Sequence, residues 1–293
     1  MTIIPTVLQT VAPVFLLALV GFFWVRAGYE YQTEFVTRLA MTLSVPCLIF
    51  VALMNSQVSP AALTTISLAA LAGYLGLTLL FWLMLRAAGL DLRTYLAPLT
   101  YGNTGNLGLP LALFAYGDEG LGYAVVVFAV MAILSFTIGI RMVAGSGSFV
   151  KVLREPMVAA TLLGTLFLWQ GWQTPQWLTN TLQLAGQMAI PMMLITLGVA
   201  VARLHPSGFA RPLVLSLVKV LVCTALGWMI GRAFGLPPVA LSVLVLQLGT
   251  PVAVTSYLLA EKYGSDGPAV AGLVVMSTLL SVITIPLTLA LMI

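Results

Sequence analysis

The stretch that decides the fold lies inside a long apolar region and reads Tyr101-Gly102-Asn103-Thr104-Gly105-Asn106-Leu107-Gly108-Leu109-Pro110. Three glycines, two asparagines and a proline in ten residues predict a broken helix, because proline removes a backbone hydrogen bond and clashes with the preceding turn. Lipid offers no partner for the freed backbone groups. Such backbone is therefore tolerated at membrane depth only inside protein or beside a water-filled cavity.

A second stretch of this kind reads Gln247-Leu248-Gly249-Thr250-Pro251. Proline suits the first turn of a helix, so Pro110 and Pro251 are each predicted to open a second half-helix. The remaining predicted helix-break residues are Gly102, Gly105, Gly108 and Gly249.

Composition places the whole chain in a membrane. Of its 293 residues, 61% are hydrophobic and 7% are charged, whereas soluble domains carry about 25% charged residues. The sequence predicts an all-α membrane protein with ten transmembrane helices, the first a retained helix and not a cleaved leader. The expected spans are 5–25, 35–54, 61–85, 95–116, 120–140, 156–172, 177–200, 209–231, 237–259 and 268–292.

The basic residues predict the orientation. Ten of them fall in the odd-numbered loops, and the opposite face holds only Arg232. Positive residues favour the cytoplasmic side, so both termini are expected outside, in the periplasm of a cell inner membrane. The ten are Arg26, Arg38, Arg86, Arg93, Arg141, Lys151, Arg154, Arg203, Arg211 and Lys262.

The two halves of the chain resemble each other. Arg86-Ala87-Ala88-Gly89-Leu90 matches Arg232-Ala233-Phe234-Gly235-Leu236, and 106–110 matches 247–251. Tyr116 to Gly120 and Pro46 match later motifs in the same order, at offsets from 141 to 147. Each half holds five expected spans, so the pattern predicts two inverted five-helix repeats, residues 1–145 and 146–293, joined near Gly145.

The two breaks are the candidate substrate site. Each half-helix N-terminus carries about +0.5 of an elementary charge and free N–H donors, which favours a small organic anion such as a carboxylate. The expected substrate-binding residues are Asn103, Thr104, Asn106, Gln247 and Thr250. In the alternative interpretation, the glycines and prolines only kink two packed helices and the amides join neighbouring helices.

Lys219 lies near the middle of the expected eighth span. A lysine at that depth is costly and must face a partner or a cavity. It could attract the anion, take part in proton coupling, or hydrogen-bond the carbonyls of a broken helix. No Asp or Glu falls in mid-span, no metal site or cofactor is expected, and sodium held by carbonyls and hydroxyls stays open as a coupling ion.

Other classes fit less well. The basic residues are dispersed, which argues against a nucleic-acid partner. An intramembrane protease needs a buried serine–histidine pair or two mid-span aspartates, but the one histidine, His205, lies in a loop, so an enzyme is not expected. A channel could also be built from inverted repeats and half-helices, and saturable transport would distinguish the two.

Several motifs resemble bacterial members of the auxin efflux carrier family, and the resemblance covers essentially the whole chain. The most specific are Asn103 to Pro110 and the motif of the ninth span. The others are Gly117 to Leu121, Ala260 to Gly264, Ser277 to Ser281, Thr284 to Leu287, Pro13 with Gly21, and Pro46 to Phe50.

That resemblance implies a fold related to bile-acid/sodium symporters. Spans 1, 2, 6 and 7 would form a scaffold. Spans 3–5 and 8–10 would form a mobile transport domain, with the fourth and ninth spans crossing at the substrate. It also implies a homodimer, an elevator motion, contact of Asn103 with the substrate carboxylate, and a small mono- or dicarboxylate as substrate. A sodium-coupled symporter is the alternative, and the coupling ion, proton or sodium, is left open.

Overall fold

The computed structural model describes residues 3–56, 58–144, 156–204 and 208–292, and within these residues the regular structure is helical. The one β-type pairing in the described residues is an isolated antiparallel bridge between Gly102 and Val252. The α-helices are α1 (Ile3–Arg26), α2 (Thr33–Leu39), α3 (Val45–Met54), α4 (Pro60–Ala87), α5 (Leu92–Thr100), α6 (Leu109–Leu134), α7 (Ile140–Ala144), α9 (Pro156–Gln170), α10 (Gln176–Gln187), α11 (Ala189–Arg203), α12 (Ala210–Ala233), α13 (Pro238–Leu248), α14 (Val254–Tyr263) and α15 (Gly267–Met292). Three short π-helical turns join them: η1 (Ala40–Ser44), η2 (Thr104–Gly108) and η3 (Ser135–Gly139).

Seven helical segments in the described residues are long and apolar enough to cross a membrane. The helices α9 and α13 are apolar but shorter. The all-helical membrane class is therefore confirmed, whereas the count of ten spans in two inverted repeats is not. One reason is that 104–144 forms a single helical run, which Gly117 turns sharply at φ 62° and ψ −152°.

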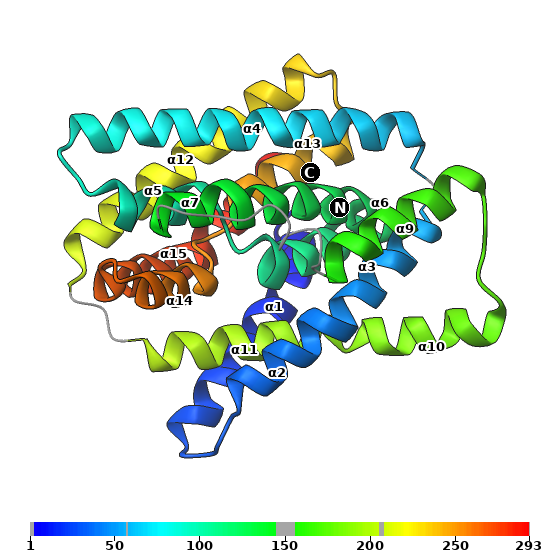
Figure 1. Ribbon diagram of the computed structural model, residues 1–293, viewed down its shortest axis with the longest axis horizontal. Helices are drawn as coiled ribbons and strands as arrows, with labels where there is room; N and C mark the ends of the chain where they lie inside the picture. The colour runs from blue at the N-terminus through cyan, green and yellow to red at the C-terminus, as the bar shows by residue number, and fades with distance from the viewer. Residues whose placement is uncertain (1–2, 57, 145–155, 205–207, 293) are drawn as a thin grey trace.

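The helices α1 and α11 pack along each other, and α3 packs against α9 and α10. The helix α4 packs on α5, α6 and α12, while α12 also contacts α13 and α15. Contacts of α1 with α6 and α15, and of α3 with α6, join these two sets of helices. Figure 1 shows α4 and α10–α11 on opposite sides of the molecule, with the broken segments between them.

Glycines bring α1 and α11 into backbone contact. A Cβ at Gly21 would overlap the carbonyl of Ile195, and a Cβ at Gly198 would overlap that of Ala18. Helices in lipid associate by such close packing, because the surrounding tails are as apolar as the side chains. These two glycines therefore allow the backbones of α1 and α11 to touch.

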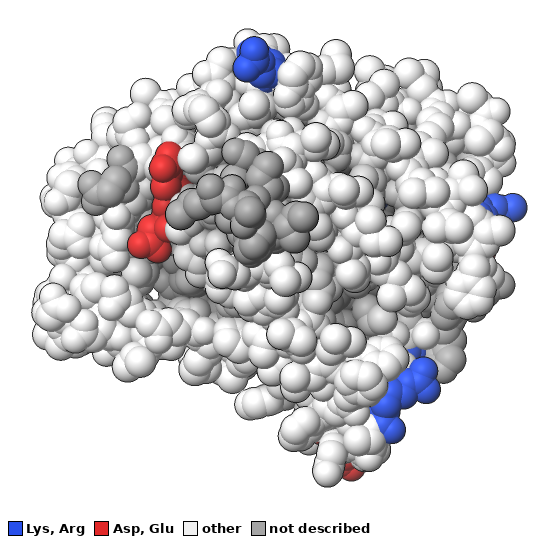
Figure 2. Space-filling view, turned by 180° about the vertical axis from the view of Figure 1, so that it is seen from behind, with Lys and Arg blue, Asp and Glu red and all other residues white. Residues whose placement is uncertain are grey.

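The surface suits lipid. Large apolar side chains such as Phe23, Leu83, Leu221 and Leu291 are exposed on the long helices, far more than a soluble monomer tolerates. Figure 2 shows one face on which a few separated basic and acidic residues interrupt an otherwise uncharged surface. The expected junction between the halves, 145–146, and His205 lie outside the described residues.

Candidate functional site

Two helix breaks cross at the centre of the molecule. The helix α5 ends where Tyr101 becomes extended at φ −102° and ψ 114°, and α13 ends at Leu248 before the segment 249–253. The N–H of Asn103 donates to the carbonyl oxygen of Pro251 across 2.7 Å. The N–H of Val252 donates to Ser277 Oγ on α15, across 2.9 Å. These contacts satisfy backbone groups for which lipid would offer no partner.

Glycines let the two breaks approach. A Cβ at Gly102 would overlap the side chain of Thr250, and a Cβ at Gly108 would overlap the amide of Gln247. A larger residue at Gly102 would therefore press on Thr250, whereas at Gly108 it would have to displace the flexible end of the Gln247 side chain.

The proline positions match the prediction only in part. Pro110 lies in the first turn of α6, but the helical run begins earlier, at Thr104, and passes through η2 into α6. The wider π turn makes bonds five residues apart, from Gly108 N–H to the Asn103 carbonyl and from Leu109 N–H to the Thr104 carbonyl. Proline has no N–H to donate. The π turn just before Pro110 shifts the backbone bonds from four to five residues apart at this point of the helix. Gly105, Gly108 and Pro110 thus lie in helix, while Gly102, Gly249 and Pro251 lie at the breaks.

The two proline motifs are also not equivalent in space. Asn106 follows the first break, in η2, whereas Gln247 precedes the second break, in the last turn of α13. Pro251 lies within the second break, and the next helix starts at Val254.

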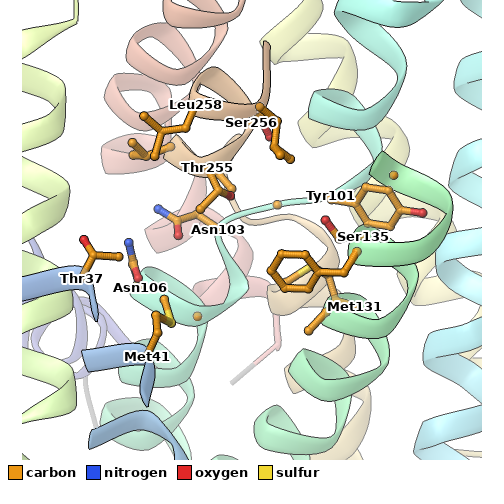
Figure 3. A pocket seen from close by; sticks show the side chains of 18 of the residues that line it. Thr37, Met41, Tyr101, Asn103, Asn106, Met131, Ser135, Thr255, Ser256 and Leu258 are labelled. Carbon is orange, nitrogen blue, oxygen red and sulfur yellow. The ribbon is translucent and has the colours of Figure 1, made fainter. Parts of the chain in front are cut away.

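A cavity of about 210 Å³ lies beside the crossing. From the two breaks and the helices that follow them, it is lined by Gly102, Asn103, Gly105, Asn106, Ala253, Val254, Thr255 and Ser256. Opposite these lie Thr37 and Met41 near the start of the second expected span and Met193 and Thr196 on α11. Figure 3 shows Asn103 on the extended segment, with Asn106, Thr37, Met41 and Thr255 around the space next to it. No charged side chain is among the described residues that line this cavity.

Asn103 carries a buried hydrogen-bond donor that has no partner among the described residues. Its side chain is 5% exposed, and the donor is the amide Nδ2. A buried unpaired donor costs about 1–3 kcal/mol, so an acceptor in the cavity would be stabilised there. Two helix N-termini border the same space: the start of η2, which leads into α6, and the start of α14. Each carries the partial positive charge of a helix N-terminus.

Asn106 lines the cavity with Asn103, whereas Thr104, Gln247, Thr250 and Lys219 lie away from its lining. Thr104 is fully buried, and its hydroxyl has no partner in the described part of the chain. Gln247 is also fully buried, with its Nε2 3.4 Å from the carbonyl oxygen of Ala124. Thr250 donates its hydroxyl to the Gln247 carbonyl across 2.7 Å. Lys219 donates from Nζ to the Leu99 carbonyl across 2.8 Å.

Comparison with known proteins assigns the family. The model of a family described as membrane transport protein matches residues 6–155 and 146–289, nearly the whole chain. The chain belongs to the auxin efflux carrier family. The protein is therefore a multi-pass member of a membrane transporter family, which speaks against an enzyme.

Curated relatives carry transporter names. An uncharacterized transporter of Methanothermobacter thermautotrophicus is 26% identical over 95% of this chain and 96% of its own length. An uncharacterized transporter of Methanocaldococcus jannaschii is 25% identical, over 64% of each chain. A Rhizobium meliloti protein named "Putative malonate transporter" is 26% identical, over 63% of this chain and 62% of its own. The chain thus spans less than two thirds of the length of two of these three carriers.

Sequence reasoning missed the hydroxyl groups that this family member contributes from neighbouring helices. Thr37, Ser135, Thr196 and Thr255 all line the cavity. Single Ser and Thr residues are common in spanning helices, where they often bond back to the carbonyl four residues earlier, as Thr196 does to Met192. No local sequence motif distinguishes the four hydroxyl residues at the cavity from ordinary Ser and Thr residues in spanning helices.

Proposed function

We propose that the protein is a secondary carrier that moves a small organic anion, a mono- or dicarboxylate, across the inner membrane. The observation that carries the proposal is the buried Asn103 amide Nδ2, which has no partner among the described residues and lies at a cavity where those residues place no charged side chain. An amide donor and two helix N-termini can bind a carboxylate without a fixed cation.

The size of the cavity supports a small substrate. Pockets for drug-sized ligands measure roughly 300–1,000 Å³, whereas this cavity measures about 210 Å³. The name of the Rhizobium relative, which refers to malonate, agrees with a dicarboxylate of that size. Asn103 and Asn106 are the proposed ligands, and Gln247 and Thr250, which lie off the lining, are proposed to support the crossing.

The proposed architecture has ten spans in two inverted five-helix repeats, 1–145 and 146–293, with both termini outside. Spans 1, 2, 6 and 7 would be the scaffold, and spans 3–5 and 8–10 the moving domain of an elevator in a homodimer. The position of the cavity supports this division, because Thr37 and Met193 belong to the first group and Asn103 and Thr255 to the second.

The test is a transport assay on proteoliposomes that hold the full chain. Solid-supported-membrane currents, with radiolabelled uptake for electroneutral transport, would be recorded for a panel of organic acids that includes malonate. Saturable transport of one acid is expected. A flux that never saturates would indicate a channel, and strict dependence on Na⁺ would indicate a symporter of the bile-acid type.

The site is tested by Asn103→Ala. A hydrogen bond to a charged group contributes about 1.5–3 kcal/mol, so the half-saturation concentration should rise about 10- to 100-fold. The matched control is Asn180→Ala, on exposed α10 and away from the cavity. Equal effects of the two variants, or none from Asn103→Ala, would move the anion site elsewhere.

A further inference from the structure

Lys219 replaces a lost backbone donor at the first break. Its side chain, in the middle of α12, is fully buried, and its Nζ donates to the Leu99 carbonyl in the last turn of α5. In an unbroken α-helix that carbonyl would accept from the N–H of residue 103. The Asn103 N–H instead donates to Pro251, so the lysine takes the position that the break left open.

The partner of the ammonium is the helix end and not a carboxylate. Arg38 with Glu34 is the one ion pair among the described residues, and no cluster of acidic, histidine or cysteine side chains that could hold a metal occurs in that part of the chain. The C-terminus of a helix carries about −0.5 of an elementary charge, which favours a cation. A charge buried at this depth needs such compensation.

We propose that the Lys219 ammonium is a built-in cation at the end of α5, in the place of a coupling ion, so that carrier turnover needs no Na⁺. Carriers with broken helices hold their coupling cations on unwound carbonyls and half-helix C-termini. At the first break that end is already occupied by the lysine. The Na⁺ part rests on the proposed carrier function, while the cation site itself does not.

The second break is held by neutral donors. At the end of α13 the carbonyl of Val245 accepts from the Gly249 N–H, and that of Gln247 accepts from the Thr250 hydroxyl. Among the described residues, Lys219 is thus the one charged side chain that an observed hydrogen bond places at the end of α5 or of α13.

Two buried hydroxyls lie close in the chain to Lys219 and to its partner Leu99. An ammonium has three N–H donors, and one is used on Leu99. Ser216, one turn earlier on α12, and Thr100, next to Leu99, each have a buried hydroxyl without a partner among the described residues. A free alkylammonium that took the place of the lysine side chain would find the same acceptor, the Leu99 carbonyl.

The site is tested by chemical rescue of the purified full chain. Lys219→Ala removes the equivalent of propylammonium, so added propylammonium should raise its melting temperature with saturation and leave the wild type unchanged. Tetramethylammonium, which has no N–H donor, should not do so. In Lys219→Met the longer side chain fills the space, so propylammonium should have no effect. Absence of rescue, or equal effects of both cations, would overturn the cation site.

Ion replacement tests the consequence without any variant. When N-methyl-D-glucamine replaces Na⁺, transport by the wild type should change less than about twofold, and a loss of tenfold or more would overturn the proposal. If no acid is transported in either medium, the carrier function fails, while the melting experiment still decides the cation site.

Discussion

The two helix breaks cross at one point but are built differently. At the first, a buried ammonium binds the end of α5 and a π turn restarts the helix. At the second, the Thr250 hydroxyl binds the end of α13 and α14 restarts as an ordinary helix. The first break also brings to the cavity the Asn103 amide, whose Nδ2 has no partner in the described part of the chain, while Gln247 stays buried in the crossing. Sequence similarity between two halves therefore does not give them equal chemistry.

Lys219 has a counterpart in position that sharpens this contrast. It stands thirteen residues before Arg232, as Gly73 stands thirteen before Arg86. Gly73 lies against the side chain of Leu248 at the end of α13, with 3.0 Å from its virtual Cβ to Cδ1. Both long helices thus meet the end of a broken helix, one with an ammonium and the other with a glycine.

The largest effect is expected where the breaks touch. Gly102→Val would push a side chain into Thr250. Overpacking of this kind typically costs about 1–3 kcal/mol, and the separated breaks should lose transport about 100-fold or more. Uptake and thermal melting would measure both. Gly208→Ala is the control, because no atom of the described residues lies within 4 Å of its added Cβ. Transport by Gly102→Val at half the wild-type rate would contradict the crossing.

The next effect distinguishes a residue that binds the anion from one that stabilises the crossing. Asn103→Ala should weaken apparent affinity and leave melting nearly unchanged. Gln247→Ala, at a fully buried position in the crossing, should destabilise the protein by about 1–2 kcal/mol with less than a threefold change in the half-saturation concentration. The reverse pattern in concentration-dependent uptake and melting curves would show that the second break holds the anion.

A smaller effect concerns the bond that positions the second break. Ser277→Ala removes the acceptor of the Val252 N–H, so hydrogen exchange at that amide should speed up about tenfold. The neighbouring Thr278 has a buried hydroxyl without a partner in the described chain, and Thr278→Val should change little. Equal protection in both variants would mean that Ser277 does not hold the break.

The sequence predicted the features that depend on local chemistry. Glycine, asparagine and proline inside an apolar run located both breaks, because irregular backbone has no hydrogen-bond partners in lipid. It did not locate the restart of the first helix, since a π turn before Pro110 depends on which carbonyls the crossing satisfies. Nor could it separate Asn103 from Gln247, because cavity access is set by the packing of α14 and α11. The bond of Lys219 to Leu99 was one of three open interpretations, and only the approach of α12 to α5 selected it.

The smallest expected effect compares how the two broken helices begin. Asp91 caps α5 through bonds from the N–H groups of Arg93 and Thr94, whereas Pro237 precedes α13 without a side-chain cap. The hydrogen bond from Thr94 lowers the pKa of Asp91, against the opposing effect of partial burial. A lowered pKa contributes stability that is present above the unfolded pKa, about 3.9, and is lost as the pH falls through the folded value.

The melting temperature of the wild type should therefore decrease as the pH is lowered below about 4. The decrease should be smaller in Asp91→Asn, which keeps a cap but not the charge. Glu34→Gln, at an exposed pair, is the control, and an equal pH dependence in Asp91→Asn and wild type would mean that this cap does not titrate with folding.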